Sequence, residues 1–168
     1  MDIAAVSLAI VLGLALSLST GLRAFLAPFF LSLAGWLGWV ELDGALSWMT
    51  SGVAVGTFGC AILFEVAADK FPAVDHLMDT LHVFLKPVAG TLVAMAMMEG
   101  VDPLVASVAG LSTGGIVAGG THLAKASVRV GSTATTAGTG NPVLSLLEDV
   151  VAIVLAGAAA LGAGALAA

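Results

Sequence analysis

The chain has 168 residues, of which 60% are apolar and only 10% are charged, and its mean hydropathy is +1.12. Soluble domains carry about 25% charged residues, so this chain has too little polar surface to cover a water-soluble globule, and a bilayer is its natural solvent. The net charge of −6 argues against nucleic acid as a partner. A single cysteine, Cys60, excludes an internal disulfide.

Apolar runs predict an all-α polytopic membrane protein with about six transmembrane helices, forming a single domain over residues 1–168. Each run approaches the roughly 20 residues that a helix needs to cross a bilayer. The first run lacks the basic start of a secretory signal, so we expect it to remain as a membrane helix. The expected spans are Ile3–Thr20, Leu22–Val40, Ser51–Ala68, Leu81–Met98, Pro103–Leu123 and Val143–Ala168.

Two glycine-containing stretches leave alternatives open. In GLSTGGIVAGG, residues 110–120, the spacing of the glycines favours close contact between helices. The same glycines are compatible with a broken helix that exposes backbone carbonyls. The Ser/Thr-rich stretch 126–142 has no clear helical pattern and is interpreted as a cytoplasmic loop, with re-entry into the protein as the alternative.

The charges are segregated between the two ends of the expected spans. One end holds all five bases, Arg23, Lys70, Lys86, Lys125 and Arg129. The other end holds only acids, Asp2, Glu41, Asp43, Glu99 and Asp102. The positive-inside rule makes the basic end cytoplasmic and places both termini outside. Three tryptophans cluster near the outer end of the second span, as in an interfacial belt, and they are Trp36, Trp39 and Trp48.

An internal repetition suggests three repeated helical hairpins. The pattern L-x-x-F-L-x-P begins at Leu22 and recurs at Leu81. The spacing from Lys70 to Pro87 recurs from Lys125 to Pro142. Units of two spans keep the same orientation, so these hairpins would be parallel repeats.

Much of the charge gathers in ADKFPAVDHLMDTLHVFLKP, residues 68–87. On a helix that begins near Asp75, the side chains of Asp79, His82 and Lys86 fall on the same face as that residue, within about 60°. His122, Lys125 and Arg129 form a second, basic stripe after the fifth span. Acyl chains cannot solvate charged or hydrogen-bonding groups, so these side chains must contact each other or face water.

These stripes predict a polar site at the cytoplasmic end. We expect a substrate or proton pathway formed by Glu65, Asp69, Asp79, His82, His122, Lys125 and Glu148. The expected charge partners are Arg23, Lys86, Arg129 and Asp149. Pairs joining Glu65 or Asp69 with Lys125 or Arg129 are reasonable, although a purely structural salt-bridge network is the simpler alternative. Arg23 either reaches lipid headgroups or folds inward towards the carboxylates of the last span.

Histidine beside carboxylate can relay protons near neutral pH, which favours passage of a small solute or ion, coupled to protons. A non-transporting scaffold or complex subunit is the alternative, and self-association as a homo-oligomer is open. We expect no enzyme, no catalytic residue and no cofactor. A membrane enzyme acting on lipid or quinone, with His and Asp as acid and base, is the least favoured class, because no nucleophile or metal signature stands out. We expect no metal either, because His76 and His82 diverge by about 120° on a helix.

Four segments resemble a family of small bacterial integral membrane proteins, the domain-of-unknown-function family 4126. They are TGLRAFLAPFF, EVAADKFPAVDHLMDTLHVFLKPVAG, GGTHLAKASVR and GNPVLSLLEDV. The resemblance extends from about Leu12 to Ala156, and its most specific part is A-D-K-x-P-x-V-D-H. Lys86 stands where the family pattern has arginine, which keeps the charge. The resemblance implies a multi-span protein of the bacterial cytoplasmic membrane and brings no established activity.

Overall fold

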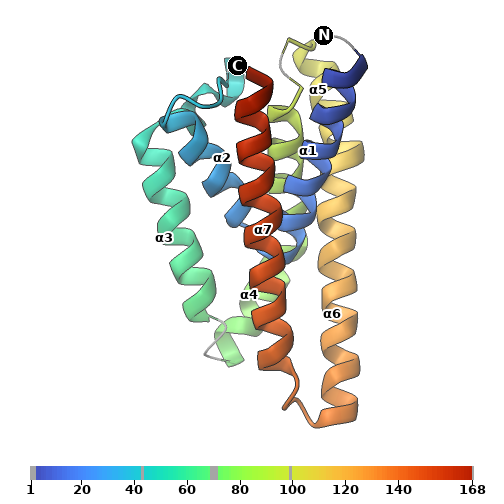
Figure 1. Ribbon diagram of the computed structural model, residues 1–168. Coiled ribbons are helices and arrows are strands. Elements are labelled where there is room, and N and C mark those ends of the chain that lie inside the picture. Colours follow the sequence, from blue (N-terminus) through green and yellow to red (C-terminus); the bar gives the residue numbers. More distant parts are fainter. Residues whose placement is uncertain (1–2, 43, 69–71, 99, 168) are drawn as a thin grey trace.

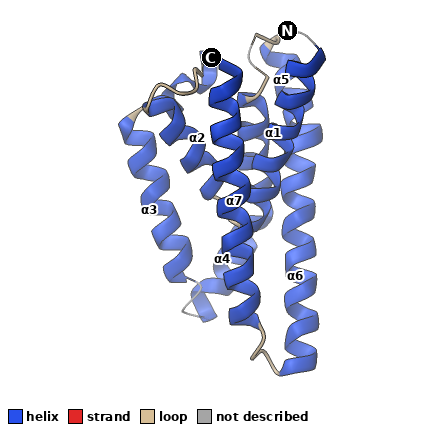
Figure 2. Ribbon diagram, viewed as in Figure 1, coloured by secondary structure: helices blue, strands red, loops and turns tan. Residues whose placement is uncertain are grey.

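The computed structural model of the chain describes residues 3–42, 44–68, 72–98 and 100–167, and every regular element among them is a helix (Figures 1 and 2). Side chains are described over the same ranges except residues 72–76 and 166–167. The prediction of an all-α chain is therefore confirmed. The elements are α1 (Ile3–Leu22), α2 (Leu26–Trp36), the 3₁₀ helix η1 (Gly44–Thr50), α3 (Gly52–Ala68), α4 (Pro72–Ala96), α5 (Pro103–Gly110), the π-helical turn η2 (Leu111–Gly115), α6 (Ile116–Thr136) and α7 (Asn141–Ala167).

Within the described ranges, four helices are long and apolar enough to cross a bilayer, and they are Ile3–Leu22, Leu77–Ala96, Pro103–Thr136 and Asn141–Ala165. The pair η1 and α3, bent by 71°, makes a fifth candidate if it counts as one broken span. The predicted second span shrinks to the 11 residues of α2. It starts late because residues 23–25 turn the chain, and it ends early because Gly38, with φ of 75°, begins a turn.

The glycines of residues 110–120 lie in a continuous helix that runs from α5 through η2 into α6. Gly114 faces Gly90 of α4 so closely that a Cβ on Gly114 would lie 2.2 Å from the Gly90 carbonyl oxygen. A Cβ on Gly110 would lie 3.0 Å from the Thr91 carbonyl oxygen. The close-packing interpretation is therefore confirmed, and the segment is not a break.

The interpretation of residues 126–142 as a loop is wrong. α6 continues to Thr136 and ends where Ala137 and Gly138 take positive φ values of 50° and 84°. Four Ser and Thr hydroxyls of this segment donate to backbone carbonyls four residues earlier, as Thr133 does to Arg129 at 2.9 Å. Their polarity is thereby absorbed within the helix, which a composition-based reading of the segment does not anticipate.

The helices pack around α1, which contacts α4, α6 and α7, while α3 lies at the edge of the bundle against α2 (Figure 1). α1 begins and α7 ends at the same end of the bundle, and the α6–α7 turn lies at the opposite end (Figure 1). A buried apolar core closes the half nearer the termini, and it includes Leu12, Leu16, Leu31, Met49 and Val93. The buried charged residues, Arg23, Glu65 and Lys86, lie in the other half.

Candidate functional site

The site is built on the place where α1 ends. The last carbonyl groups of a helix have no partner inside it, and here these include Gly21 O and Leu22 O. Lys86 Nζ of α4 donates hydrogen bonds to both oxygens, at 3.0 and 3.2 Å. Lys125 Nζ of α6 donates to Leu22 O at 3.1 Å. Two ammonium groups from different helices therefore cap the negative end of the α1 dipole.

Lys86 is the most enclosed of these cations, with only 1% of its surface exposed. Its third hydrogen bond goes to Nδ1 of His122 on α6, at 3.2 Å. An ammonium group has three N–H donors, and all three are satisfied. With Lys86 charged, Nδ1 of His122 is the acceptor, so the ring proton of His122 belongs on Nε2.

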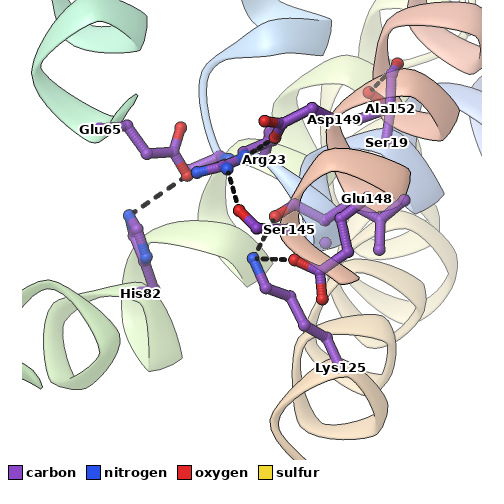
Figure 3. Close-up of polar contacts among 12 residues, drawn as sticks. Ser19, Arg23, Glu65, His82, Lys125, Ser145, Glu148, Asp149 and Ala152 are labelled. Atoms are coloured by element: carbon purple, nitrogen blue, oxygen red, sulfur yellow. Dashed lines mark hydrogen bonds and ion pairs between the residues drawn. The ribbon is translucent and has the colours of Figure 1, made fainter. Parts of the chain in front are cut away.

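Glu65 on α3 reaches the same place from the side, with 2% of its surface exposed. Its Oε1 accepts a hydrogen bond from the Ala24 backbone N–H at 3.1 Å and lies 3.7 Å from Nε2 of His82 (Figure 3). Its Oε2 is buried and accepts no hydrogen bond from any described residue. The His82 ring lies edge-on to the His122 ring, with 6.2 Å between the ring centroids.

The opposite wall of the site comes from α7. Arg23, only 3% exposed, forms an ion pair with Asp149 and donates from Nη2 to the Ser145 hydroxyl at 3.1 Å (Figure 3). Glu148 Oε2 accepts from Lys125 at 3.1 Å and from Arg129 at 2.9 Å. The two acids at the start of α7 therefore bind separate bases, one on the α1–α2 connection and one pair on α6.

We call this assembly the charge cluster. It comprises Arg23, Glu65, His82, Lys86, His122, Lys125, Arg129, Glu148 and Asp149. Its members come from α3, α4, α6, α7 and the α1–α2 connection, so no single helix contains the site.

Most of the residues predicted from sequence do meet in the charge cluster. Asp79 takes part only through its backbone, which hydrogen-bonds the His122 ring, whereas its side chain is exposed one turn before His82. Asp69 lies outside the described residues. The predicted pairing of Glu65 with Lys125 or Arg129 is wrong, because both bases bind Glu148 instead. Of the two readings of Arg23, the inward one is correct.

Sequence reasoning missed the groups that are not charged. These are the carbonyl oxygens of Gly21 and Leu22, the N–H of Ala24, and the Ser145 hydroxyl. Two signals could have found them. A helix that ends beside Arg23 leaves free carbonyls that attract lysines, and Ser145 precedes Asp149 by four residues, which places both on one face of α7.

In the described part of the chain, no group of three or more His, Cys, Asp or Glu is arranged to hold a metal ion. Hard cations such as Ca²⁺ and Mg²⁺ prefer six or more oxygen ligands, which the charge cluster does not supply.

Apolar helices of membrane-spanning length and a buried cluster of opposite charges define the class of helical, membrane-type proteins. The family model described as Domain of unknown function (DUF4126) matches residues 10–165. The chain therefore belongs to this family, as its sequence motifs indicated. No functionally described protein and no solved structure matches the chain.

Proposed function

We propose that this chain is a multi-pass protein of the bacterial cytoplasmic membrane that passes a small solute or ion, with protons exchanged at the charge cluster. In this proposal the bundle crosses the membrane six times, and α2 and the bent pair η1–α3 count as crossings. Both termini lie outside, because the end that holds Arg23, Lys86 and Lys125 is basic. The three hairpins α1–α2, α3–α4 and α6–α7 are then parallel repeats.

One observation carries the proposal. Glu65 is buried, yet one carboxylate oxygen has no hydrogen-bond donor among the described residues. Leaving a buried acceptor unsatisfied costs about 1–3 kcal/mol, and more for a charged group. Buried polar atoms of a purely structural network are mostly hydrogen-bonded, so this oxygen favours a role beyond packing. A carboxyl that takes up and releases a proton needs one oxygen free for that proton.

The neighbours of Glu65 extend the exchange path across three helices. His82 Nε2 lies 3.7 Å from Glu65, the His82 and His122 rings meet edge-on, and His122 contacts Lys86 at 3.2 Å. Imidazole is the side chain that most readily changes charge near neutral pH. The exposed Asp79, one turn before His82, is the entrance to this path from the cytoplasm.

A second candidate, the non-transporting scaffold or complex subunit, is favoured by the packing of the other half. There the core of Leu12, Leu16, Leu31 and Val93 is closed, and every base of the described cluster has a partner. For a carrier, the same packing corresponds to the conformation that is closed towards the outside. For a scaffold, it is the only conformation.

Proton movement in proteoliposomes separates the two candidates. The purified protein is reconstituted with a pH-sensitive dye inside, a pH gradient is imposed, and a mixed panel of amino acids, sugars, organic acids and salts is added outside. We expect the gradient to decay at least five-fold faster than in empty liposomes. Glu65→Gln, which keeps the Ala24 hydrogen bond but cannot ionise, should return the decay to the empty-liposome rate.

Glu41→Gln is the matched control, since Glu41 is exposed and lies near Ala96 at the C-terminal end of α4, beyond His82 and Lys86. It should decay at the wild-type rate. Equal decay in wild type, Glu65→Gln and empty liposomes, under every solute of the panel, supports the scaffold and contradicts passage of a solute.

A further inference from the structure

A cavity of about 310 Å³ lies outside the charge cluster, in the half of the bundle nearer the termini. Its floor is where α1 meets η2, at Gly13 and Thr113, and its back wall is the end of α4, at Ala94, with Met97 just beyond that helix. Apart from Thr113, the residues that line it are apolar or glycine. The Thr113 hydroxyl is already bound to the Ala109 carbonyl at 2.7 Å, so it offers no donor to a ligand.

The cavity opens sideways, towards the surface that the bilayer would cover. α1 packs along α4 and η2 but makes no extended contact with α5 in the described residues. Between these two helices the lining includes Val6 and Ile10, which are 44% and 54% exposed. A molecule dissolved in the bilayer can therefore enter between α1 and α5 without passing through water.

The dimensions of the cavity favour a chain lying parallel to the helices. Its lining on α1 extends from Val6 to Leu14, which corresponds to about 12 Å at 1.5 Å per residue. One leaflet of a bilayer has an apolar depth of about 15 Å, half of the roughly 30 Å hydrocarbon core. The cavity therefore spans most of the leaflet on the side opposite the charge cluster.

Charge at the open end points to the kind of headgroup. A second cavity of about 200 Å³ shares Met98 and Val101 with the first and extends to Glu41. The exposed Asp102 lies beside Val101. None of the described bases lies at this end, because Arg23, Lys86, Lys125 and Arg129 all belong to the charge cluster. An amine-bearing headgroup is attracted here and a net anionic one is repelled.

We infer that this cavity is a binding site for one acyl chain of an amine-bearing, zwitterionic phospholipid, whose headgroup lies near Glu41. The site requires the bundle to be embedded in a bilayer but does not require transport. Met97 and Met98 suit such a ligand, because unbranched thioether side chains adapt to a flexible chain.

Native mass spectrometry of the purified chain tests the site. The protein is extracted in mild detergent and mixed with equal amounts of phosphatidylethanolamine and phosphatidylglycerol that carry the same acyl chains. We expect one retained phosphatidylethanolamine per chain, at least five-fold above phosphatidylglycerol. Ala109→Leu fills the cavity from α5 and should reduce the retained lipid at least five-fold. Glu41→Gln should equalise the two lipids without lowering their total.

Ala158→Leu is the matched control, because Ala158 is an exposed alanine on α7 that does not line the cavity. It should retain lipid as the wild type does. Val6→Phe fills the same cavity from the exposed side and replaces Ala109→Leu if that variant does not fold. Equal loss in the filling and control variants, or phosphatidylglycerol retained as well as phosphatidylethanolamine, overturns the inference. Because no flux is measured, neither result bears on the role proposed for Glu65.

Discussion

Two of the neighbours of α4 are attached to it in opposite ways. Along η2 and α6 the contact is backbone to backbone, because Gly90 and Gly114 bring the two chains within a distance that no Cβ could occupy. α3, on the other side, contacts α4 only slightly and lies mainly against α2. Near the C-terminal end of α3, Glu65 Oε1 lies 3.7 Å from His82 Nε2 of α4, which makes a polar contact between the two helices.

This difference separates a fixed part of the bundle from an adjustable one. The two helices at a glycine contact are held at one short distance, because the dispersion attraction between them weakens steeply as they separate. A contact made by titratable side chains changes strength when a proton is gained or lost. The pair Glu65 and His82 therefore lies where a change of charge can alter how α3 sits on α4, while the α4–α6 contact stays unchanged.

The largest expected effect comes from disrupting the contact between Gly90 and Gly114. Gly114→Val places side-chain carbon about where the Gly90 carbonyl oxygen now lies, since even a Cβ would be 2.2 Å from it. We expect destabilisation of about 3 kcal/mol or more, because backbone cannot move aside as a flexible side chain does. Thermal unfolding in detergent, followed by circular dichroism, measures it.

Gly120→Ala is the control for this prediction. Gly120 lies in the same helix, but a Cβ there meets nothing within 4 Å. The variant should unfold at or slightly above the wild-type temperature, since alanine favours helix more than glycine does. Similar losses in both variants would mean that the glycines act through helix propensity and not through contact.

The next effect concerns Lys86, which joins α4 to α1 and α6. Lys86→Met keeps a similar length and leaves Gly21 O and His122 Nδ1 without their hydrogen-bond donor. We expect a loss of about 3 kcal/mol, the cost typical of removing one partner from a buried polar group. Chemical denaturation of the reconstituted protein gives this value.

Lys125→Met provides the comparison. Its two acceptors keep other donors, because Lys86 still binds Leu22 O and Arg129 still binds Glu148. We expect a loss of about 1 kcal/mol or less. If Lys125→Met were as damaging as Lys86→Met, the cluster would depend on its total charge and not on individual hydrogen bonds.

The sequence predicts the helical class, the charged end and all nine of the charged or histidine side chains that meet there, including Lys86 and His122. Hydropathy and the period of 3.6 residues are enough for this, because lipid excludes charge and forces such residues together. The glycine contact of residues 110–120 could also be anticipated from its spacing.

The partners and the helix ends could not be predicted, for physical reasons. Whether Glu148 or Glu65 accepts from Lys125 depends on the crossing angles of four helices, which composition does not determine. Helix α2 is short because Gly38 turns the chain, although the residues around Gly38 are as apolar as those of a span. The stretch 126–136 is helical because its hydroxyls bond within the helix, and a count of Ser and Thr predicts the opposite.

A smaller effect is expected at the contact between α3 and α4, where Glu65 lies near His82. Glu65→Ala removes the acceptor of the Ala24 N–H and the partner of His82. We expect the lower end of α3 to open more readily by about 1 kcal/mol, which is roughly five-fold in amide hydrogen exchange. Glu65→Gln keeps the Ala24 hydrogen bond and should exchange as the wild type does. Equal protection in all three proteins would show that α3 is held by apolar contacts with α2 alone.

The smallest expected effect lies between α6 and α7, which meet chiefly through ion pairs at Glu148. Arg129→Gln should cost about 0.5 kcal/mol or less, because Lys125 remains on the same carboxylate oxygen at 3.1 Å. Combined with Lys125→Met, it leaves that partly buried carboxylate without a base. The double variant should therefore lose at least about 1 kcal/mol more than the sum of the single losses. Strict additivity would show that Glu148 is solvated well enough to need neither base, and α7 would then be held by Arg23 and Asp149.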